Sequence, residues 1–559
     1  MVQPAGNGEL SPHYYRDNFL ALCDTVEAQY ADLLTAEECA LLADFRQLDF
    51  EAQCLYVRLV SRVGPWFRES RLAYAELGEI APLVDTLLAA RLVAVAEGLA
   101  VAELGRLFTV TELRRGAGSR LTGPPPRGKP ALLDALAELA LDEAGYLQLM
   151  AAVDGERIIA PCGVAEVQLF QLLFFGNRRQ SLTDFVLSDL GIARYYPYPL
   201  DREHRLFPHR EALEEYLACA ACSDAWHELR DSGDADGLLA LADTMLASEV
   251  RFSSTEGRWY RLCNGVARDL ERLGALDTAL QLYQRSHRHP ARERRLRILE
   301  RLEDWPAAAA LGGAILAAPW CEEEFDAGSR VLPRIRRRLG QKPGARPRDA
   351  FARLDLVLPP QRGSVERQVA KHLEPGWRSV HYVENRLMNA LFGLAFWEQI
   401  FMPIPGAFHN PYQSVPTDMY GPEFLARRRQ ALEHRLRLLG EGDIGAILAE
   451  AYHNYGGYQC RWVDWRMLDA ALLATVTRVI PGGHLLAVWQ RMLFDPRENR
   501  RGFPDLLALG ETPGEYCLIE VKGPGDALQD SQKRWLRFFR RQGIPASVAW
   551  VSRGEPVGG

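Results

Sequence analysis

The chain has 559 residues, of which 48% are hydrophobic, and a formal net charge of −7. This composition excludes a disordered chain and predicts a large soluble enzyme with three or four domains. The negative charge argues against a generally basic coat for nucleic acid, so any contact with DNA must come from local patches.

Cysteine usage and the N-terminal residues bear on the cellular compartment. The ten cysteines are scattered, and Cys219 and Cys222 lack the further pair of ligands that would complete a zinc site. We therefore interpret this pair as part of a helix core. Because no disulfide framework is evident and residues 1–10 are polar, we expect a cytoplasmic, nucleoid-associated protein without a signal peptide.

Apolar residues at helical spacing predict an N-terminal helical domain in residues 1–70. The most apolar stretch of the chain, residues 87–108, is interrupted by four charged residues. We expect a helical hairpin there and no membrane span.

Residues 71–145 read as a helix, a basic loop and a second helix. The first helix begins near Phe108 with Thr109 or Thr111 as its cap, and the second follows Gly128. This arrangement resembles a SAP module, a small DNA-binding unit. The basic residues that would meet phosphates are Arg114, Arg115, Arg120, Arg127 and Lys129. An ordinary solvated loop between helices explains the same residues equally well.

Residues 146–345 are predicted to be helical, with successive helical hairpins from about residue 205 onward. Their spacing resembles degenerate tetratricopeptide repeats, which stack into a long concave surface. Arginines concentrate at 285–297 and 334–338 and offer a candidate path for DNA, although such runs usually form a solvated face. Pro, Gly and basic residues at 340–347 predict a hinge before the last domain, residues 346–559.

Two short apolar segments near the C-terminus predict a strand hairpin. One runs from Pro504-Asp505 to Leu509, the other from Cys517 to Lys522, and Gly510, Pro513 and Gly514 lie between them. Side chains alternate along a strand, so Glu520 and Lys522 share one face and Val521 lies on the other. An acid and a lysine are thereby held side by side, next to a second acid, Asp505.

This trio predicts a site for a divalent cation. Two carboxylates about 4 Å apart repel by roughly 4 kcal/mol at an effective dielectric near 20, unless a positive charge intervenes. Carboxylates and a backbone carbonyl, here that of Val521, suit Mg²⁺ or Mn²⁺, one or two ions. Lys522 would then orient an attacking water and offset charge on a phosphate. An acid and a lysine two residues apart are more often ordinary charged residues on a solvated surface. The Pro504-Asp505 segment makes the interpretation as a nuclease site more favourable.

The segment after the hairpin extends the pattern. Residues 528–542 predict an amphipathic helix, and residues 546–551 a further strand. The order strand, strand, helix, strand resembles the PD-(D/E)xK nuclease core, specifically the virus-type replication-repair nuclease module. Gln532 matches a glutamine of that module and is, with Arg501, a candidate DNA contact.

A third acid is expected at Glu384, at the start of an apolar helix that runs to Leu394. The block 384–438 resembles the Fanconi-anaemia-associated nuclease family, as do residues 59–68 and 174–191. In that family the acid at the position of Glu384 is a metal ligand. No N-terminal ubiquitin-binding zinc finger of the animal members is visible, which suggests a bacterial-type member.

The resemblance implies a multidomain chain with mainly α-helical N-terminal and middle regions and a C-terminal α/β, restriction-endonuclease-like nuclease domain. It implies a metal-dependent phosphodiesterase with Glu384, Asp505, Glu520 and Lys522 as catalytic residues. The substrates would be branched or flapped DNA, cut at 5′ flaps or trimmed in the 5′-to-3′ direction by a monomer, in repair that includes interstrand crosslinks. A four-way-junction resolvase, another nuclease of this core and a non-catalytic DNA-junction scaffold stay open.

Overall fold

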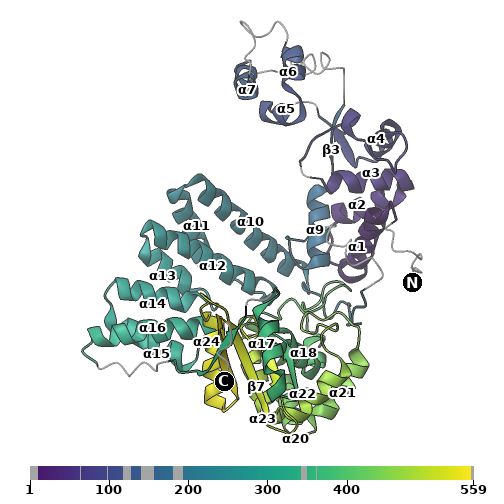
Figure 1. The fold of residues 1–559 in the computed structure, drawn as a ribbon. Helices are drawn as coiled ribbons and strands as arrows, with labels where there is room; N and C mark the ends of the chain where they lie inside the picture. Colours follow the sequence, from purple (N-terminus) through teal and green to yellow (C-terminus); the bar gives the residue numbers. More distant parts are fainter. Residues whose placement is uncertain are drawn as a thin grey trace. The chain divides into compact units, whose positions relative to one another are not determined.

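The computed structural model describes residues 11–62, 64–96, 99–117, 128–139, 157–180, 193–341, 349–359 and 362–554. By packing, the chain divides into two units, Met1–Ala193 with Leu200–Arg202, and Arg194–Pro199 with Glu203–Gly559. The first unit is mainly helical and the second ends in an α/β domain (Figure 1). This confirms the predicted fold class.

The first unit contains helices and one small sheet. The sheet has the order β1-β3-β2, with both pairs antiparallel. Its strands are β1 (Phe67–Arg68), β2 (Val93–Val95) and β3 (Ile158–Pro161). The helices are α1 (Tyr14–Tyr30), α2 (Ala36–Gln47), α3 (Phe50–Val60), α4 (Ile80–Ala89), α5 (Val101–Leu107), α6 (Val110–Ala117), α7 (Lys129–Glu138) and α9 (Val164–Phe175).

The predicted helical hairpin at residues 87–108 is wrong. The stretch contains the end of α4, strand β2 and helix α5. Val93 and Val95 pair with β3, a strand far along the chain, so the extended conformation depends on a partner that local spacing does not show. Among the described helices none alone is long and apolar enough to span a membrane, although the bent pair Ala470–Val479 and Gly482–Phe494 meets the criteria of length and composition together.

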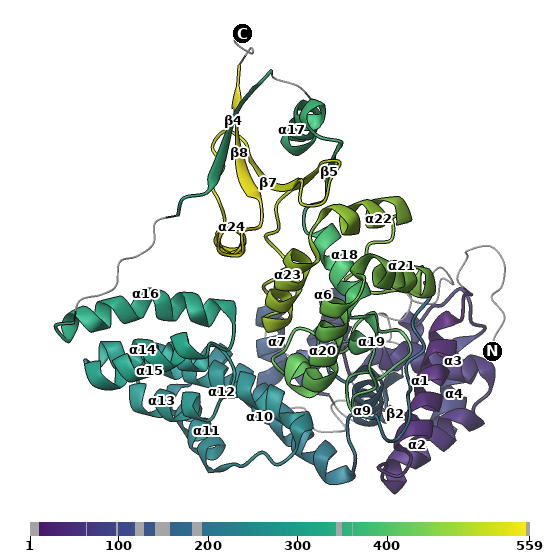
Figure 2. The ribbon, with the colours of Figure 1, turned by 90° about the horizontal axis from the view of Figure 1, so that it is seen from below.

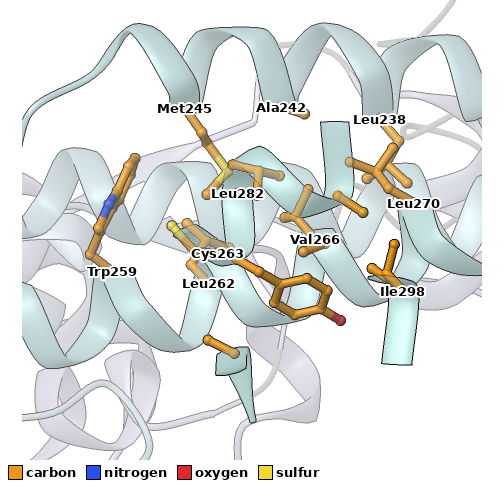
Figure 3. Packing of buried hydrophobic residues seen from close by; sticks show 14 of the residues in the cluster. Leu238, Ala242, Met245, Trp259, Leu262, Cys263, Val266, Leu270, Leu282 and Ile298 are labelled. Carbon is orange, nitrogen blue, oxygen red and sulfur yellow. The ribbon is translucent and has the colours of Figure 1, made fainter. Parts of the chain in front are cut away.

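In the second unit seven helices follow one another along the chain, and each packs against the next, in keeping with the predicted succession of helical hairpins. They are α10 (Arg210–Ser232), α11 (Ala235–Ala247), α12 (Ser253–Leu273), α13 (Leu276–Gln284), α14 (Ala291–Arg301), α15 (Trp305–Ala317) and α16 (Glu322–Arg338). Residues of α12 fill the centre of this array, where Cys263 and Val266 contact side chains of the neighbouring helices (Figure 3). Cys219 is buried in the same cluster, in keeping with its assignment to a helix core.

The C-terminal domain is built on a five-stranded mixed sheet of order β4-β8-β7-β6-β5. The pairs β4–β8 and β8–β7 are parallel, and β7–β6 and β6–β5 are antiparallel. The strands are β4 (Ala352–Leu358), β5 (Ser379–Tyr382), β6 (Leu506–Leu509), β7 (Tyr516–Lys522) and β8 (Ala546–Arg553). The helices are α17 (Val365–Leu373), α18 (Arg386–Ala395), α19 (Trp397–Ile400), α20 (Glu423–Glu441), α21 (Ile444–Tyr455), α22 (Ala470–Val479), α23 (Gly482–Phe494) and α24 (Asp530–Gln542).

Helix α17 covers one face of this sheet and helix α24 covers the other (Figure 2). Ile519 and Val521 of β7 face a core cluster that they share with Val369 of α17. The residue between them, Glu520, contacts Gln532 of α24. The predicted alternation along β7 is therefore confirmed, and so is the predicted order of strand, strand, helix and strand in β6, β7, α24 and β8.

The loop before β6 is pressed against α24. Gly502 has φ +83°, and a Cβ atom added there would lie 2.8 Å from the backbone carbon of Ser531. The indole N–H of Trp535 donates to the Arg501 carbonyl at 3.1 Å, and the ring of Trp535 stacks on Phe503 at 4.1 Å. The path of the chain into β6 is thus fixed by glycine and by one aromatic pair.

We expect Gly502→Ala to lower the free energy of unfolding by clearly more than Gly514→Ala. Gly514 has φ +89° but open space around its Cβ position, so alanine there meets only the left-handed backbone cost of about 1–2 kcal/mol. At position 502 the backbone clash adds to the same cost. Denaturant unfolding of both variants measures the difference, and equal losses would contradict this account of the loop.

Candidate active site

Asp505 lies immediately before β6. It is hydrogen-bonded to Val383 and Glu384, the two residues that follow β5. Its carbonyl oxygen accepts the N–H groups of Val383 and Glu384, both at 2.9 Å. These bonds continue the pairing of β5 with β6 by one step and bring the Glu384 side chain next to Asp505. The Tyr382 hydroxyl donates to Oε2 of Glu384 at 3.0 Å and orients it.

The structure corrects the expected position of Glu384. It does not lie on a helix, because α18 begins at Arg386, and Glu384 has φ +42° in the connection after β5. A non-glycine residue in the left-handed region costs of order 1–3 kcal/mol and persists only where its surroundings impose it. The two bonds to the Asp505 carbonyl impose it here.

Glu520 and Lys522 lie side by side on β7, and both are buried, with 1% and 7% of their surfaces exposed. Lys522 Nζ is 2.8 Å from Oε1 of Glu520, and the amide of Gln532 donates to the same oxygen at 2.5 Å. The other carboxylate oxygen, Oε2, is buried and has no hydrogen-bond partner among the described residues. An unpaired buried carboxylate oxygen is costly and favours binding of a partner that the described residues do not supply.

The negative charge of Asp505, which is half-buried, acts on the buried carboxyl group of Glu520. Burial raises the pKa of Glu520 to about 7, and the negative charge of Asp505 adds to this effect. Burial also raises the pKa of Asp505 to about 6, against the N–H of Val521, which donates to its Oδ2 at 2.8 Å. Without a cation, part of this site holds protons near neutral pH.

These features fit a divalent cation. The donor set is made of carboxylate oxygens, it carries excess negative charge, and one buried oxygen, Oε2 of Glu520, has no partner among the described residues. Hard oxygen donors of this kind suit Mg²⁺ or Mn²⁺. Asp505, Glu520 and Glu384 are the side chains that could hold such an ion.

Two residues near the site were not predicted from the sequence. Glu366, in the first turn of α17, faces Asp505 closely enough that its charge raises the pKa of that acid. The second residue, Tyr382, is the last residue of β5.

A local signal for helix α17 was present in the sequence. Ser364 caps this helix and accepts a hydrogen bond from the Arg367 N–H, and a serine before a helical apolar pattern indicates a helix start. Nothing local indicates that the helix packs beside Asp505.

The remaining predicted residues of this domain lie as follows. The Val521 side chain is in the core, and its N–H group holds Asp505. Arg501 is exposed and forms an ion pair with Glu498. Gln532 contacts Glu520, so its position in this structure serves to orient that carboxylate.

The SAP-like region is described in part. Thr109 caps α6 as predicted, since its N–H donates to Glu112 at 2.7 Å and its hydroxyl accepts from the Glu112 N–H. Lys129 begins α7, which packs with α5 and α6 around a small shared core. Arg120 and Arg127 lie outside the described residues.

Many arginines of the two concentrations are engaged in contacts within the protein. The partners are glutamates of neighbouring turns and helices, which reduces the charge available to DNA. The pairs are Arg288–Glu423, Arg292–Glu324, Arg294–Glu271, Arg297–Glu293 and Arg334–Glu300. These pairings weaken the expectation that the two runs form a DNA path.

Comparison with known families agrees with the geometry. The VRR-NUC domain model matches residues 439–553, which contain Asp505, Glu520, Lys522 and Gln532. A second model, described as the FAN1 HTH domain, matches residues 13–94. The fold and the site therefore define a nuclease, a hydrolase with a VRR-NUC domain.

Relatives extend the match over the whole chain. A Fanconi-associated nuclease 1 homolog of Pseudomonas aeruginosa is 37% identical over 97% of this chain and 96% of that protein. The human Fanconi-associated nuclease 1 is 26% identical over 98% of this chain and 63% of its own length. A crystal structure of paFAN1 bound to 2-nucleotide 5′-flap DNA with a gap is similar with a TM-score of 0.79 and 36% identity, covering 99% of this chain and all of that one. The chain belongs to the Fanconi-associated nuclease 1 family.

We expect cation binding to strengthen as pH rises from about 5.5 to 8, because the cation must displace protons from Glu520 and Asp505. The raised pKa values mean that the folded, metal-free protein binds more protons than the unfolded chain in this range, so its stability falls as pH rises. A bound cation offsets this loss of stability, because it neutralises the ionised carboxylates. The difference in Tm with and without excess Mn²⁺ should therefore grow with pH and level off near pH 8.

Glu520→Gln is the matched control for this measurement, because it keeps the shape of the side chain and removes its titration. In that variant the Mn²⁺-dependent difference in Tm should be small at every pH. A wild-type difference that stays constant between about pH 5.5 and 8 would contradict the proposed linkage.

Proposed function

We propose that this chain is a divalent-metal-dependent DNA nuclease that hydrolyses phosphodiester bonds at 5′ flaps. The observation that carries the proposal is the buried Oε2 of Glu520, beside Asp505 and Lys522, which has no hydrogen-bond partner in the part of the chain that the structure describes. A bound Mg²⁺ or Mn²⁺ would supply Lewis-acid stabilisation of charge on the phosphate and lower the pKa of a water. Glu384, Asp505, Glu520 and the Val521 carbonyl would hold it.

The chain's own residues divide the remaining tasks. Gln532 fixes Glu520, the Val521 N–H fixes Asp505, and Tyr382 fixes Glu384. Lys522 presents its ammonium group next to Glu520, where it would orient the attacking water and offset negative charge on the phosphate. Water adds to phosphorus, the bond to the departing oxygen breaks, and that oxygen takes up a proton.

The proposed substrate rests on the relatives. The similar crystal structures are of paFAN1 bound to 5′-flap DNA with a gap, one with a 1-nucleotide and one with a 2-nucleotide flap. We extend this binding to the present chain, with 5′-to-3′ trimming and a role in DNA repair, including that of interstrand crosslinks. Arg501, Lys129 and Arg127 are proposed DNA contacts, and the protein is proposed to act as a monomer.

Cleavage of end-labelled DNA tests the proposal. We expect purified protein with Mg²⁺ or Mn²⁺ to cut a 5′ flap in preference to a 3′ flap, a four-way junction or single-stranded DNA. Asp505→Asn should reduce the rate by more than about 100-fold, because it removes a ligand and not merely a supporting contact. Asp526→Asn is the matched control, since among the described residues the side chain of this exposed acid accepts only the Gly523 N–H, at 2.8 Å.

Two results would contradict the proposal. Paired symmetric cuts on four-way junctions in preference to flaps would indicate a resolvase. Binding of flapped DNA without metal-dependent cutting would indicate a scaffold.

A further inference from the structure

Three side chains of the kinds that bind transition metals meet where α14 and α16 begin. One ligand atom from each of His289, Cys321 and Glu323 lies within 4.8 Å of the others. His289 precedes α14, and Cys321 is the N-terminal cap residue of α16. These two helices pack against each other (Figure 1), and the cluster shares no residue with the proposed nuclease site.

The separations match those between ligands of one small cation. His289 Nε2 lies 3.4 Å from Oε2 of Glu323 and 3.7 Å from Oε2 of Glu293. Metal–ligand bonds of about 2.0–2.3 Å in tetrahedral geometry place neighbouring ligand atoms roughly 3.3–3.7 Å apart. The other oxygen of Glu293 accepts from Arg297 at 2.8 Å, which turns Oε2 toward the imidazole.

The two segments are held together without any ion. Arg292, the second residue of α14, donates two hydrogen bonds, of 2.8 and 2.5 Å, to Glu324, which is fully buried. Glu324 also accepts the Trp320 N–H at 2.6 Å, and the guanidinium of Arg292 lies 4.0 Å from the centre of the Trp320 ring. The turn that carries Cys321 is therefore fixed against His289, so a cation would find its ligands already positioned.

A simple ion pair does not account for the whole cluster. A protonated His289 between Glu293 and Glu323 would explain the two carboxylates. It would give no role to the Cys321 thiol, whose sulfur lies within 4.8 Å of the ligand atoms of His289 and Glu323. A coordinated cation would instead take that sulfur as a ligand, in its thiolate form.

We propose that His289, Cys321 and Glu323 bind Zn²⁺, with Glu293 or a water as the fourth ligand. A set of one nitrogen, one sulfur and one oxygen donor favours Zn²⁺ over Mg²⁺ or Mn²⁺, which take oxygen ligands. The site would join α14 to α16 and would be structural.

The position of the zinc site predicts an effect on thermal stability. Glu322, between two of the proposed ligands, is 2.8 Å from Arg491 and accepts from Asn499 at 3.1 Å. Zn²⁺ would therefore stabilise the junction between the helical array and the sheet domain. We expect it to raise the Tm and to leave phosphodiester cleavage with Mg²⁺ unchanged at low temperature.

Titration of the full-length protein with Co²⁺ and Zn²⁺ tests the proposal after treatment with a chelator. Co²⁺ should give a thiolate-to-cobalt charge-transfer band, and Zn²⁺ should abolish the band. Carboxylates of the nuclease site cannot give this signal, because it requires a sulfur ligand. Cys321→Ser should lose the band, and Cys39→Ser, at an exposed cysteine, should keep it.

Glu323→Gln guards against misfolding of the cysteine variant, because this side chain is half exposed. It should fold with unchanged Tm in the absence of metal and bind Zn²⁺ at least about 10-fold more weakly. Absence of the charge-transfer band in the wild type, or its survival in Cys321→Ser, would overturn the proposal. Equal Zn²⁺ affinity in Glu323→Gln would remove Glu323 from it.

Discussion

The repulsion between the half-buried carboxylate of Asp505 and the buried carboxylate of Glu520 is the constraint on which the rest of the site depends. Both acids are taken out of water by the sheet and its covering helices, and both have raised pKa values for that reason. The fold nevertheless keeps them together, with Lys522 as one positive neighbour. A site that stores this electrostatic cost is poised to bind a cation, and the cost explains why the surrounding hydrogen bonds are directed at carboxylates.

Support for the site extends into the helical array. Arg534 of α24 contacts Asp326 of α16 and Glu498, both at 3.2 Å. The guanidinium of Arg491 lies 5.0 Å from the centres of the Trp535 and Phe538 rings of α24. Because α24 also carries Gln532, the helix that orients Glu520 is anchored to the last helix of the array. The array is thus part of what positions the site.

The hairpin that carries the site was predictable from local sequence. Alternation along β7 and the turn residues around Gly514 determine which side chains share a face, and no distant contact is needed to see it. Glu384 could be identified as a candidate ligand, but its position outside a helix could not be predicted. The reason is that its backbone is held by the carbonyl of Asp505, a residue far along the chain. Strand β5 is short and half-buried, so its sequence lacks a clear strand pattern.

The same reason accounts for the other differences. Glu366 affects Asp505 only through the packing of α17, and β2 exists only because β3 lies beside it. The arginine run in α14 looks like a basic surface in the sequence, yet Arg294 pairs with Glu271 of the preceding pair of helices. Long-range pairing decided each of these cases, and a single sequence does not encode it in any local pattern.

Anomalous diffraction from crystals of the protein soaked in Mn²⁺ tests the central claim most directly. The account predicts a manganese peak in contact with Asp505 and with Oε2 of Glu520, and no such peak in crystals of Glu520→Gln. An ordered wild-type site that holds no manganese at saturating concentration, with Asp505 and Glu520 in the same positions, would contradict it.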